Sequence, residues 1–322
     1  MSSDAPLLAA LPSIFTVDRA RKAGYDDELI QHMVRSGIWL RERRNVLVTA
    51  ELRSLVEDDA RQRFAVRAQA ALLTVGNQAC VSHESAAFLH GLVVAEPTRI
   101  TLTVPSGYAA PRSYSSLRVR PATVPPAHRT TRHGVPVTSK PRTLIDVARH
   151  LDFVQAVVAG DDALHRGLVT PSQLRDVLNE CRQWPYVQKA ERAVAFMDGR
   201  RESPLESRSF VFLLESGISL PTPQAPVLDE DGHLVARVDM LWEGLGVVGE
   251  CDGKLKYAND PNGDSLWQEK RRQERLEGLG YIVVRWGWDD LDAAAFLKRR
   301  ILAAHQRAVA WGRQVVGRPP RS

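Results

Sequence analysis

The chain has 322 residues, more than one compact core usually holds, so about 150 residues per domain predicts two or three domains. Its 44% hydrophobic and 25% charged residues are typical of folded globular proteins and argue against intrinsic disorder. The net charge of +5 is compatible with nucleic acid as a partner but is too small to establish one alone.

The cysteines and the chain's N-terminal end indicate where the protein works. Cys80, Cys181 and Cys251 are far apart and form no CxxC pair, so we expect reduced thiols and neither a zinc site nor a disulfide scaffold. The N-terminal stretch has no basic segment before a long apolar run, and nowhere do 18 apolar residues follow one another. We therefore expect a cytoplasmic protein with no membrane partner.

Residues 15–49 carry the pattern of two short helices followed by two strands. Gly24 is placed to end the first helix, and Asp26 or Asp27 can cap the second. A basic turn and an apolar strand follow, so the order is helix, turn, helix, two-stranded wing. We predict a winged helix-turn-helix over residues 1–58.

In a winged helix-turn-helix the second helix enters the major groove and the basic wing contacts phosphate. The alternative is a protein-docking module whose polar side chains are only solvated. The candidate DNA-binding residues, on the polar face of the second helix and at the wing tip, are Gln31, His32, Arg35, Arg41, Arg43 and Arg44.

Residues 59–198 are expected to form a middle mixed α/β domain. Helices are predicted at 61–74 and in the sequence SHESAAFLHGL, and strands at 99–104 and 117–120. The stretch 121–139 is rich in Pro, Thr and basic residues, and we expect it to be an extended connection outside the core. Without a Gly-x-Ser-x-Gly elbow we assign no chemistry to the scattered candidates Ser82, His83, His90 and Asp146.

A linker-like stretch, 198–204, introduces a third domain over residues 199–322. Ser203 is predicted to cap a helix that has Pro204 in its first turn and Glu206 three residues after the cap. Strand patterns follow, and the expected order is helix, three strands, helix, strand, helix. The predicted fold class is therefore α+β multidomain, ending in an α/β domain.

Asp239 and Glu250 form the constellation with the clearest chemistry. They lie on consecutive predicted strands with a short connection, and side chains alternate along a strand, so a hairpin brings both carboxylates to one face. Facing carboxylates repel, and Mg²⁺ is held by one or two carboxylates with water and phosphate oxygens. The pair predicts a Mg²⁺ (or Mn²⁺) site for phosphodiester hydrolysis; the alternative is a pair of edge-strand charges that prevent aggregation.

The motifs SPLESR, ECDGxxKY, EKRRxxxLxxLGY and VVRW resemble the PD-(D/E)XK nuclease superfamily, in particular an endonuclease-like domain related to the very-short-patch repair endonuclease. The resemblance implies a restriction-endonuclease-like fold with Asp239 and Glu250 as metal ligands and Glu206 as a third. The superfamily's lysine falls two residues after the strand Glu, where this chain has Asp252. Its candidate replacements are Lys254, Lys256 and Lys270.

A strongly charged helix after these strands adds a candidate phosphate-binding surface. Arg271 and Arg272 are interleaved with acidic residues, so they either grip a DNA backbone or belong to solvated pairs within the helix.

The N-terminal motifs, SHESAAFLHGL and GVPVTSKPRTLIDVAR together with the winged unit, resemble the AbiEi-type antitoxins of type IV toxin–antitoxin systems. In that family the winged domain binds operator DNA, so the resemblance implies a toxin-gene operator or a protein partner. The leading hypothesis is a DNA-binding protein with a Mg²⁺-dependent DNA endonuclease domain. The alternative is a non-catalytic transcriptional regulator or antitoxin with a degenerate nuclease-like domain, which the displaced lysine favours.

Overall fold

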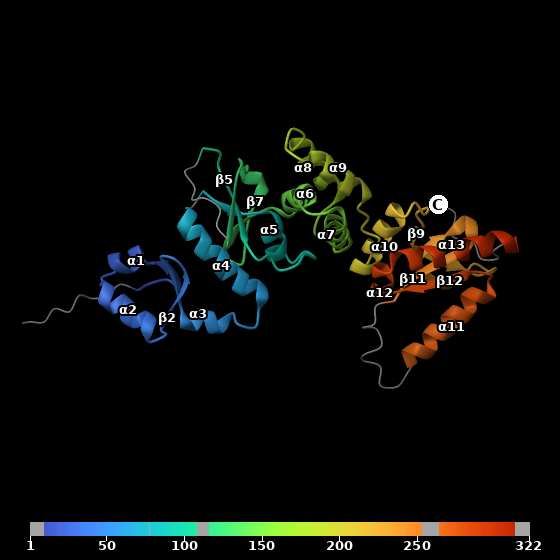
Figure 1. The fold of residues 1–322 in the computed structure, drawn as a ribbon, viewed down its shortest axis with the longest axis horizontal. Helices are drawn as coiled ribbons and strands as arrows, with labels where there is room; N and C mark the ends of the chain where they lie inside the picture. The colour runs from blue at the N-terminus through green and yellow to red at the C-terminus, as the bar shows by residue number, and fades with distance from the viewer. Residues whose placement is uncertain (1–9, 77, 108–115, 253–263, 313–322) are drawn as a thin grey trace, which may run out of the picture. The chain divides into compact units, whose positions relative to one another are not determined.

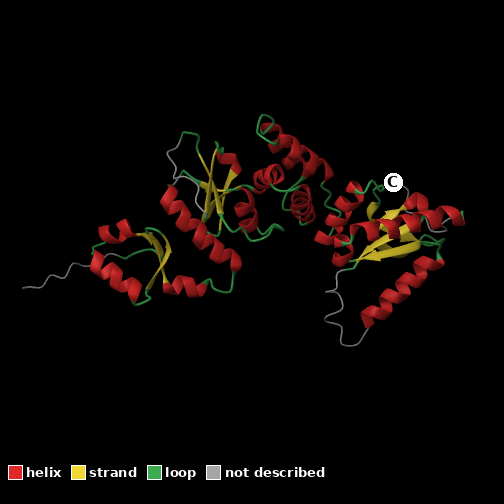
Figure 2. Ribbon diagram, in the orientation of Figure 1, coloured by secondary structure: helices red, strands yellow, loops and turns green. Residues whose placement is uncertain are grey.

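The computed structural model describes residues 10–76, 78–107, 116–252 and 264–312 (Figure 1). Helices alternate with sheets throughout this part of the chain, so the expected α+β multidomain class is confirmed at that level (Figure 2). Contacts divide the chain into two compact units, residues 1–151 with 169–192 and residues 152–168 with 193–322. The boundaries expected after residues 58 and 198 stay predictions. No helix among the described residues has the length and apolar content needed to cross a bilayer.

The first unit begins with two short helices and a small sheet. Its elements are β1 (Ile14–Thr16), α1 (Val17–Lys22), α2 (Asp27–Arg35), β2 (Trp39–Arg43), β3 (Val46–Thr49) and α3 (Ala50–Leu55). Asp26 caps α2 by accepting the N–H of Leu29 at 2.8 Å, as the sequence predicts. The antiparallel strands have the order β1-β3-β2, so β2 and β3 form a hairpin directly after the two helices.

Helix α4 (Ala60–Val75) belongs to two hydrophobic cores of the first unit. Val66 and Ala70 pack with buried residues of β1 and β3, while Phe64 and Leu72 join the core of the next sheet. A helix that is buried on both sides shows little amphipathic pattern. It joins the small N-terminal sheet to the sheet that follows it.

The second sheet of the first unit contains a hairpin where the sequence suggested none. Its elements are β4 (Cys80–Val81), α5 (His83–His90), β5 (Ile100–Val104), β6 (Leu117–Pro121), β7 (Arg129–Arg132), β8 (Val135–Thr138) and α6 (Lys140–His150), with strand order β6-β5-β4-β8-β7. The expected extended connection over 121–139 is therefore wrong. Val135 and Val137 are fully buried, and His133 and Gly134 turn the chain with φ of 49° and 71°. Positive φ at both central residues is what a tight two-residue hairpin needs.

Helices α8 (Pro171–Glu180) and α9 (Val187–Phe196) follow, and α9 runs from the first unit into the second. The elements of the second unit are α7 (Phe153–His165), α10 (Pro204–Glu215), β9 (Thr222–Leu228), β10 (Leu234–Trp242), β11 (Val247–Cys251), α11 (Asp264–Gly278), β12 (Ile282–Trp286), α12 (Trp288–Asp292) and α13 (Ala294–Trp311). From α10 onward the second unit has the expected order of elements, except that two helices, α12 and α13, stand where one final helix was expected, and α7 belongs to it as well.

The sheet of the second unit has the order β12-β11-β10-β9, with β11 and β12 parallel and the other pairs antiparallel. Met240 and Trp242 pack with buried residues of α10 and α13 in one core. Val248 packs in a second core with Leu276 of α11. Helices therefore cover both faces of this sheet, and α11 covers the face toward which Glu250 points.

The stretch 198–204 is not the exposed linker that its composition suggests. Arg201 is 5% exposed, and its guanidinium lies 3.0 Å from Asp161 of α7. The guanidinium also faces the rings of Phe196 and Phe210 at 4.6 and 4.3 Å. Asp161 further accepts the N–H of Asp198 at 2.7 Å. This buried ion pair fastens α7 to the chain that leads into α10.

Burial of Asp161 makes the stability of the second unit depend on pH. Burial raises the pKa of Asp161 to about 6, against the opposing effect of Arg201. The unfolded chain releases this proton near pH 3.8, whereas the folded chain holds it until about pH 6, so the group's contribution falls as the pH rises through that window. Over that pH window we predict that the contribution of Asp161 to the free energy of unfolding falls by about 2–3 kcal/mol. Urea unfolding at several pH values should show a flatter profile for Asp161→Asn than for the wild type; identical profiles would contradict the assignment.

The indole of Trp286 leaves no space for a side chain at residue 249, so we predict that only glycine fits there. A Cβ at residue 249 would lie 2.5 Å from a ring carbon of Trp286, which is itself 1% exposed. Gly249→Ala should therefore lower the free energy of unfolding by about 1–3 kcal/mol through overpacking. Gly244→Ala is the control, because a Cβ at residue 244 would meet no heavy atom within 4 Å. Equal urea midpoints for the two variants would show that this contact does not matter.

Candidate functional site

A pocket of about 570 Å³ in the second unit collects the acidic residues that the sequence singles out. It lies where the start of α10 meets β9, β10, β11 and α11. Its polar and charged lining residues are Glu202, Ser203, Glu206, Gln224, Arg237, Asp239, Glu250 and Arg272.

The strand register places the two predicted carboxylates together. Met240 of β10 pairs with Gly249 of β11, so Asp239 and Glu250 occupy the adjacent positions of the same antiparallel pair. Oδ2 of Asp239 accepts the N–H of Cys251 at 2.8 Å. The pairing that the sequence predicts from strand alternation and a short connection is therefore found.

Glu206 reaches the same pocket but takes part in capping α10. Its N–H donates to Oγ of Ser203 at 3.2 Å, and the Ser203 hydroxyl donates back to Oε1 at 2.7 Å. Oε2 accepts the N–H of Glu202 at 3.0 Å and the side-chain amide of Gln224 at 2.8 Å. Burial raises the pKa of Glu206 despite these hydrogen bonds. Its carboxylate is thus held by three protein donors.

Gln224 is a pocket residue that no sequence pattern pointed to. Its amide nitrogen donates to Glu206 and also lies 3.5 Å from Oδ1 of Asp239, so it bridges the two acids. A single glutamine between prolines in an apolar strand carries no motif. Only the pairing of β9 with β10 brings it to the pocket.

Arg272 of α11 binds Glu250 with both of its terminal nitrogens. The two N–O distances are 2.8 and 3.1 Å, a bidentate pair, and Glu250 is 8% exposed. The sequence makes Arg272 a candidate phosphate-binding residue, and the structure instead places it on a predicted metal ligand. At the rim, Arg237 pairs with Glu202 at 3.0 Å.

The candidate lysines do not complete this pocket among the described residues. Lys254 and Lys256 lie outside the described residues. Lys270 is exposed on α11 and is 4.0 Å from Glu274, away from the pocket lining. Asp252 is half-buried after β11 and donates its N–H to the carbonyl of Trp286 at 2.9 Å. Arg271 is exposed on the same helix.

The donor set, as arranged, does not fit a divalent metal ion. Mg²⁺ needs several oxygen atoms at near-octahedral positions around one point. Glu206 accepts from a hydroxyl, a backbone N–H and a side-chain amide, Asp239 accepts a backbone N–H at Oδ2, and Arg272 covers both oxygens of Glu250. In the described part of the chain, the one trio of potential ligand atoms within 4.8 Å of one another is elsewhere, in the β9–β10 turn.

That trio consists of Asp229, Asp231 and His233. Oδ1 of Asp229 accepts the N–H groups of Asp231 and His233, at 3.1 and 2.8 Å. The acid therefore closes the turn, and we assign no metal to it.

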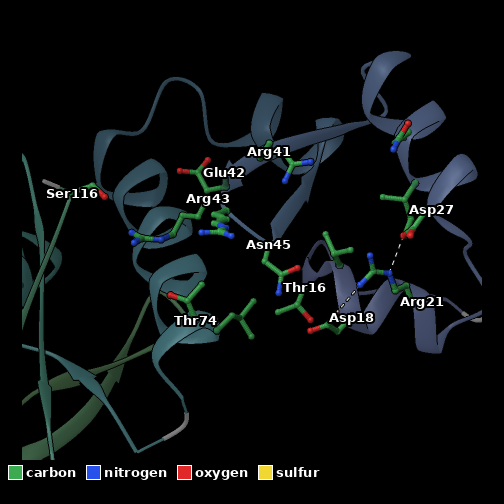
Figure 3. A pocket seen from close by; sticks show the side chains of 15 residues that line it. Thr16, Asp18, Arg21, Asp27, Arg41, Glu42, Arg43, Asn45, Thr74 and Ser116 are labelled. Carbon is green, nitrogen blue, oxygen red and sulfur yellow. Dashed lines mark hydrogen bonds and ion pairs between the residues drawn. The ribbon is translucent and has the colours of Figure 1, made fainter. Parts of the chain in front are cut away.

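The N-terminal candidates lie around a separate hollow of about 1240 Å³ within the first unit (Figure 3). Gln31, Arg41, Arg43 and Arg44 line it, while His32 and Arg35 are exposed on α2 outside it. Figure 3 also shows Arg21 held by two acids, Asp18 at 3.2 Å and Asp27 at 2.9 Å. The residues predicted to contact DNA are therefore brought to α2 and the β2–β3 hairpin.

Comparison with known families finds a match in the stretch of sequence between the residues of these two sites. Residues 77–194 match the family described as AbiEi antitoxin C-terminal domain. The match covers β4 to nearly the end of α9 and supports the antitoxin-like part of the resemblance. It does not reach the acidic pocket.

Two curated relatives are uncharacterized proteins of Mycobacterium tuberculosis, MT2308 of strain CDC 1551 and Rv2248 of strain H37Rv. Each is 28% identical over 149 residues, which are 46% of this chain and 54% of the relative. The chain thus spans about half the length of the curated relatives it matches. The crystal structure of the RV2827C protein from M. tuberculosis aligns with a TM-score of 0.38 and 17% identity, over 66% of this chain and 79% of that one.

Within the AbiEi-like region the scattered Ser, His and Asp residues serve the fold. Asp146 is fully buried and pairs with Arg142 at 3.0 Å and Arg149 at 3.2 Å. Both guanidiniums lie over the ring of Trp184, at 4.0 and 4.8 Å. His83 contacts the hydroxyl of Ser82 at 2.8 Å. With Asp146 committed to two arginines, these residues do not form a Ser–His–Asp triad.

Proposed function

We propose that the protein is a DNA-binding regulator of the antitoxin type, which binds DNA through α2 and the β2–β3 hairpin and does not cleave it. The observation that carries the proposal is the cationic and amide surface of this helix and hairpin, which precede the AbiEi-like region in the chain. We propose that these elements act as a winged helix-turn-helix, in which α2 would enter the major groove and the hairpin would follow the backbone.

The side chains on this surface suit the two kinds of DNA contact. Gln31 and Arg35 lie one turn apart on α2 and are both exposed, whereas Ile30 is buried. Glutamine and arginine can each make two hydrogen bonds to a base edge, to adenine and guanine respectively. Arg41 and Arg44 are exposed on the hairpin, where a guanidinium can bind phosphate oxygens.

The acids near this surface do not cancel its charge. Residues 17–45 contain seven Lys or Arg and five Asp or Glu. Asp18 and Asp27 pair with Arg21, and Glu42 pairs with Arg53 of α3 at 2.7 Å. Glu42, the acid of the hairpin, is thus paired outside it, so Arg44 gives the hairpin tip a net positive charge.

The match to an antitoxin family suggests the biological setting. We propose that the operator is the promoter of the protein's own gene and that a toxin is the protein partner of the AbiEi-like region. The C-terminal unit would then contribute contacts and no chemistry, since its acidic pocket is neutralised by protein donors.

DNA binding by the hairpin predicts a specific effect of salt. Arg44→Ala should weaken binding to the DNA upstream of the gene and to unrelated DNA alike. It should also reduce the slope of log affinity against log salt by about one, because one phosphate contact is lost. Fluorescence anisotropy over a range of salt concentrations measures both quantities. Arg175→Ala, an exposed arginine of α8, is the matched control and should bind like the wild type. An unchanged slope for Arg44→Ala would refute the contact.

Sequence recognition by α2 is tested separately. Gln31→Ala or Arg35→Ala should reduce discrimination between the upstream DNA and unrelated DNA by about 1–3 kcal/mol for each lost base contact. Competition with unrelated DNA at fixed salt measures that difference. If discrimination stays unchanged while overall affinity falls, α2 contacts only the backbone.

Metal-dependent DNA cleavage is the second candidate, supported by Glu206, Asp239 and Glu250 lining one pocket. Against it stand Arg272 on Glu250 and Asp252 at the position of the superfamily's lysine. We expect no Mg²⁺- or Mn²⁺-dependent nicking of supercoiled plasmid by the wild type beyond that of Asp239→Ala and Glu250→Ala. Nicking by the wild type that both substitutions abolish would favour metal-dependent cleavage over regulation without cleavage.

A further inference from the structure

We propose that the guanidinium of Arg272 is the resident cation of the acidic pocket and stands in for the divalent metal that its carboxylates would otherwise attract. The proposal goes beyond DNA binding by the N-terminal surface and does not depend on it. It explains why three acids persist in one pocket whose geometry does not fit a metal.

Among the described lining residues, Arg272 is the cation that contacts an inner acid of the pocket. Glu206 and Glu250 are 4% and 8% exposed, and Asp239 is half-buried beside them. Arg237 is engaged at the rim with Glu202, where both side chains are partly exposed. Of the described lining residues, this leaves Arg272 as the cation inside the pocket, where it binds Glu250. A buried carboxylate without a counter-charge is costly, so a cation of some kind is required there.

The geometry suits a guanidinium. Both oxygens of Glu250 accept from Arg272 at 2.8 and 3.1 Å, the parallel two-bond arrangement of arginine with a carboxylate. Asp239 takes a backbone N–H and Glu206 takes three protein donors. A metal ion could coordinate Glu250 only after displacing two charge-assisted hydrogen bonds.

The position of Arg272 on α11 makes the pair stable. Leu276, one turn later, is fully buried in the core beneath the sheet and holds the helix against β10 and β12. Arg272 lines the pocket and its side chain is 25% exposed, so the pair is largely shielded from solvent. Removal of this side chain should leave three carboxylates facing a hollow of about 570 Å³.

The test is binding of Mn²⁺ to the full-length protein, measured by titration calorimetry and by the shift in melting temperature. The wild type should show no Mn²⁺ binding that depends on Glu250 and no change in melting temperature on adding Mn²⁺ or EDTA. Arg272→Ala should melt at a lower temperature without metal, bind Mn²⁺ at least about tenfold more tightly and regain stability with it, because a ligand bound only to the folded state stabilises it.

Control variants separate this effect from a general loss of charge. Arg275→Ala, an exposed arginine on the same helix, should behave like the wild type. Arg272→Lys should keep a cation in the pocket and still exclude Mn²⁺. The double variant Arg272→Ala with Glu250→Gln should lose the binding gained by Arg272→Ala.

Two results would overturn the proposal. The first is Mn²⁺ binding by the wild type that Glu250→Gln abolishes, which would mean that Arg272 yields to metal. The second is a folded Arg272→Ala that binds no more Mn²⁺ than the wild type. Arg272→Gln, which keeps much of the side-chain volume, provides the second comparison if Arg272→Ala does not fold, and the wild-type titration decides the matter if neither variant folds.

Discussion

The register of β10 against β11 is the constraint on which the second unit depends. With Met240 opposite Gly249, two carboxylates fall side by side on the face that α11 covers. The opposite face of Gly249 has no room for a side chain, because Trp286 packs against its Cα. The sheet cannot slip by one residue without placing Glu250 in the apolar core and an apolar residue at the pocket. Once that register is fixed, the remaining question is what neutralises the acids.

In both units, arginine side chains pair with buried acids. In the first unit Asp146 is neutralised by two guanidiniums stacked on Trp184, and in the second Asp161 is neutralised by Arg201 between two phenylalanine rings. Arginine suits these positions because its planar group binds a carboxylate through its edge while its face packs on an aromatic ring. The Glu250 pair likewise places a guanidinium edge on a buried carboxylate, at a site where the sequence suggests a metal. Three buried acids, Asp146, Asp161 and Glu250, are thus each paired with arginine, whereas Glu206 is held by neutral donors.

Much of the fold follows from local patterns in the sequence, whereas the chemistry of the pocket does not. Helix caps such as Asp26 and the pairing of Asp239 with Glu250 depend on spacing along the chain, and the structure has both. The composition of the stretch, rich in Pro and Thr, predicts a loop at 129–138, although the His-Gly turn and alternating valines of the hairpin are visible in the sequence. The contact from Arg272 to Glu250 spans 22 residues and depends on how α11 lies on the sheet. No spacing rule could give it.

The same long-range contact decides how the C-terminal unit bears on function. Arranged carboxylates alone are compatible with cleavage, and the strand order alone is compatible with many activities, because a fold hosts functions through its sites. What distinguishes a metal centre from a structural acid cluster is whether the carboxylates' oxygens are available to a cation. Here the inner acids receive hydrogen bonds from backbone, amide and guanidinium groups, so the energy that would bind metal already stabilises the fold. A unit built in this way can hold a defined surface without metal, and the DNA binding that we propose falls to the cationic hairpin of the first unit, with its exposed Arg41 and Arg44.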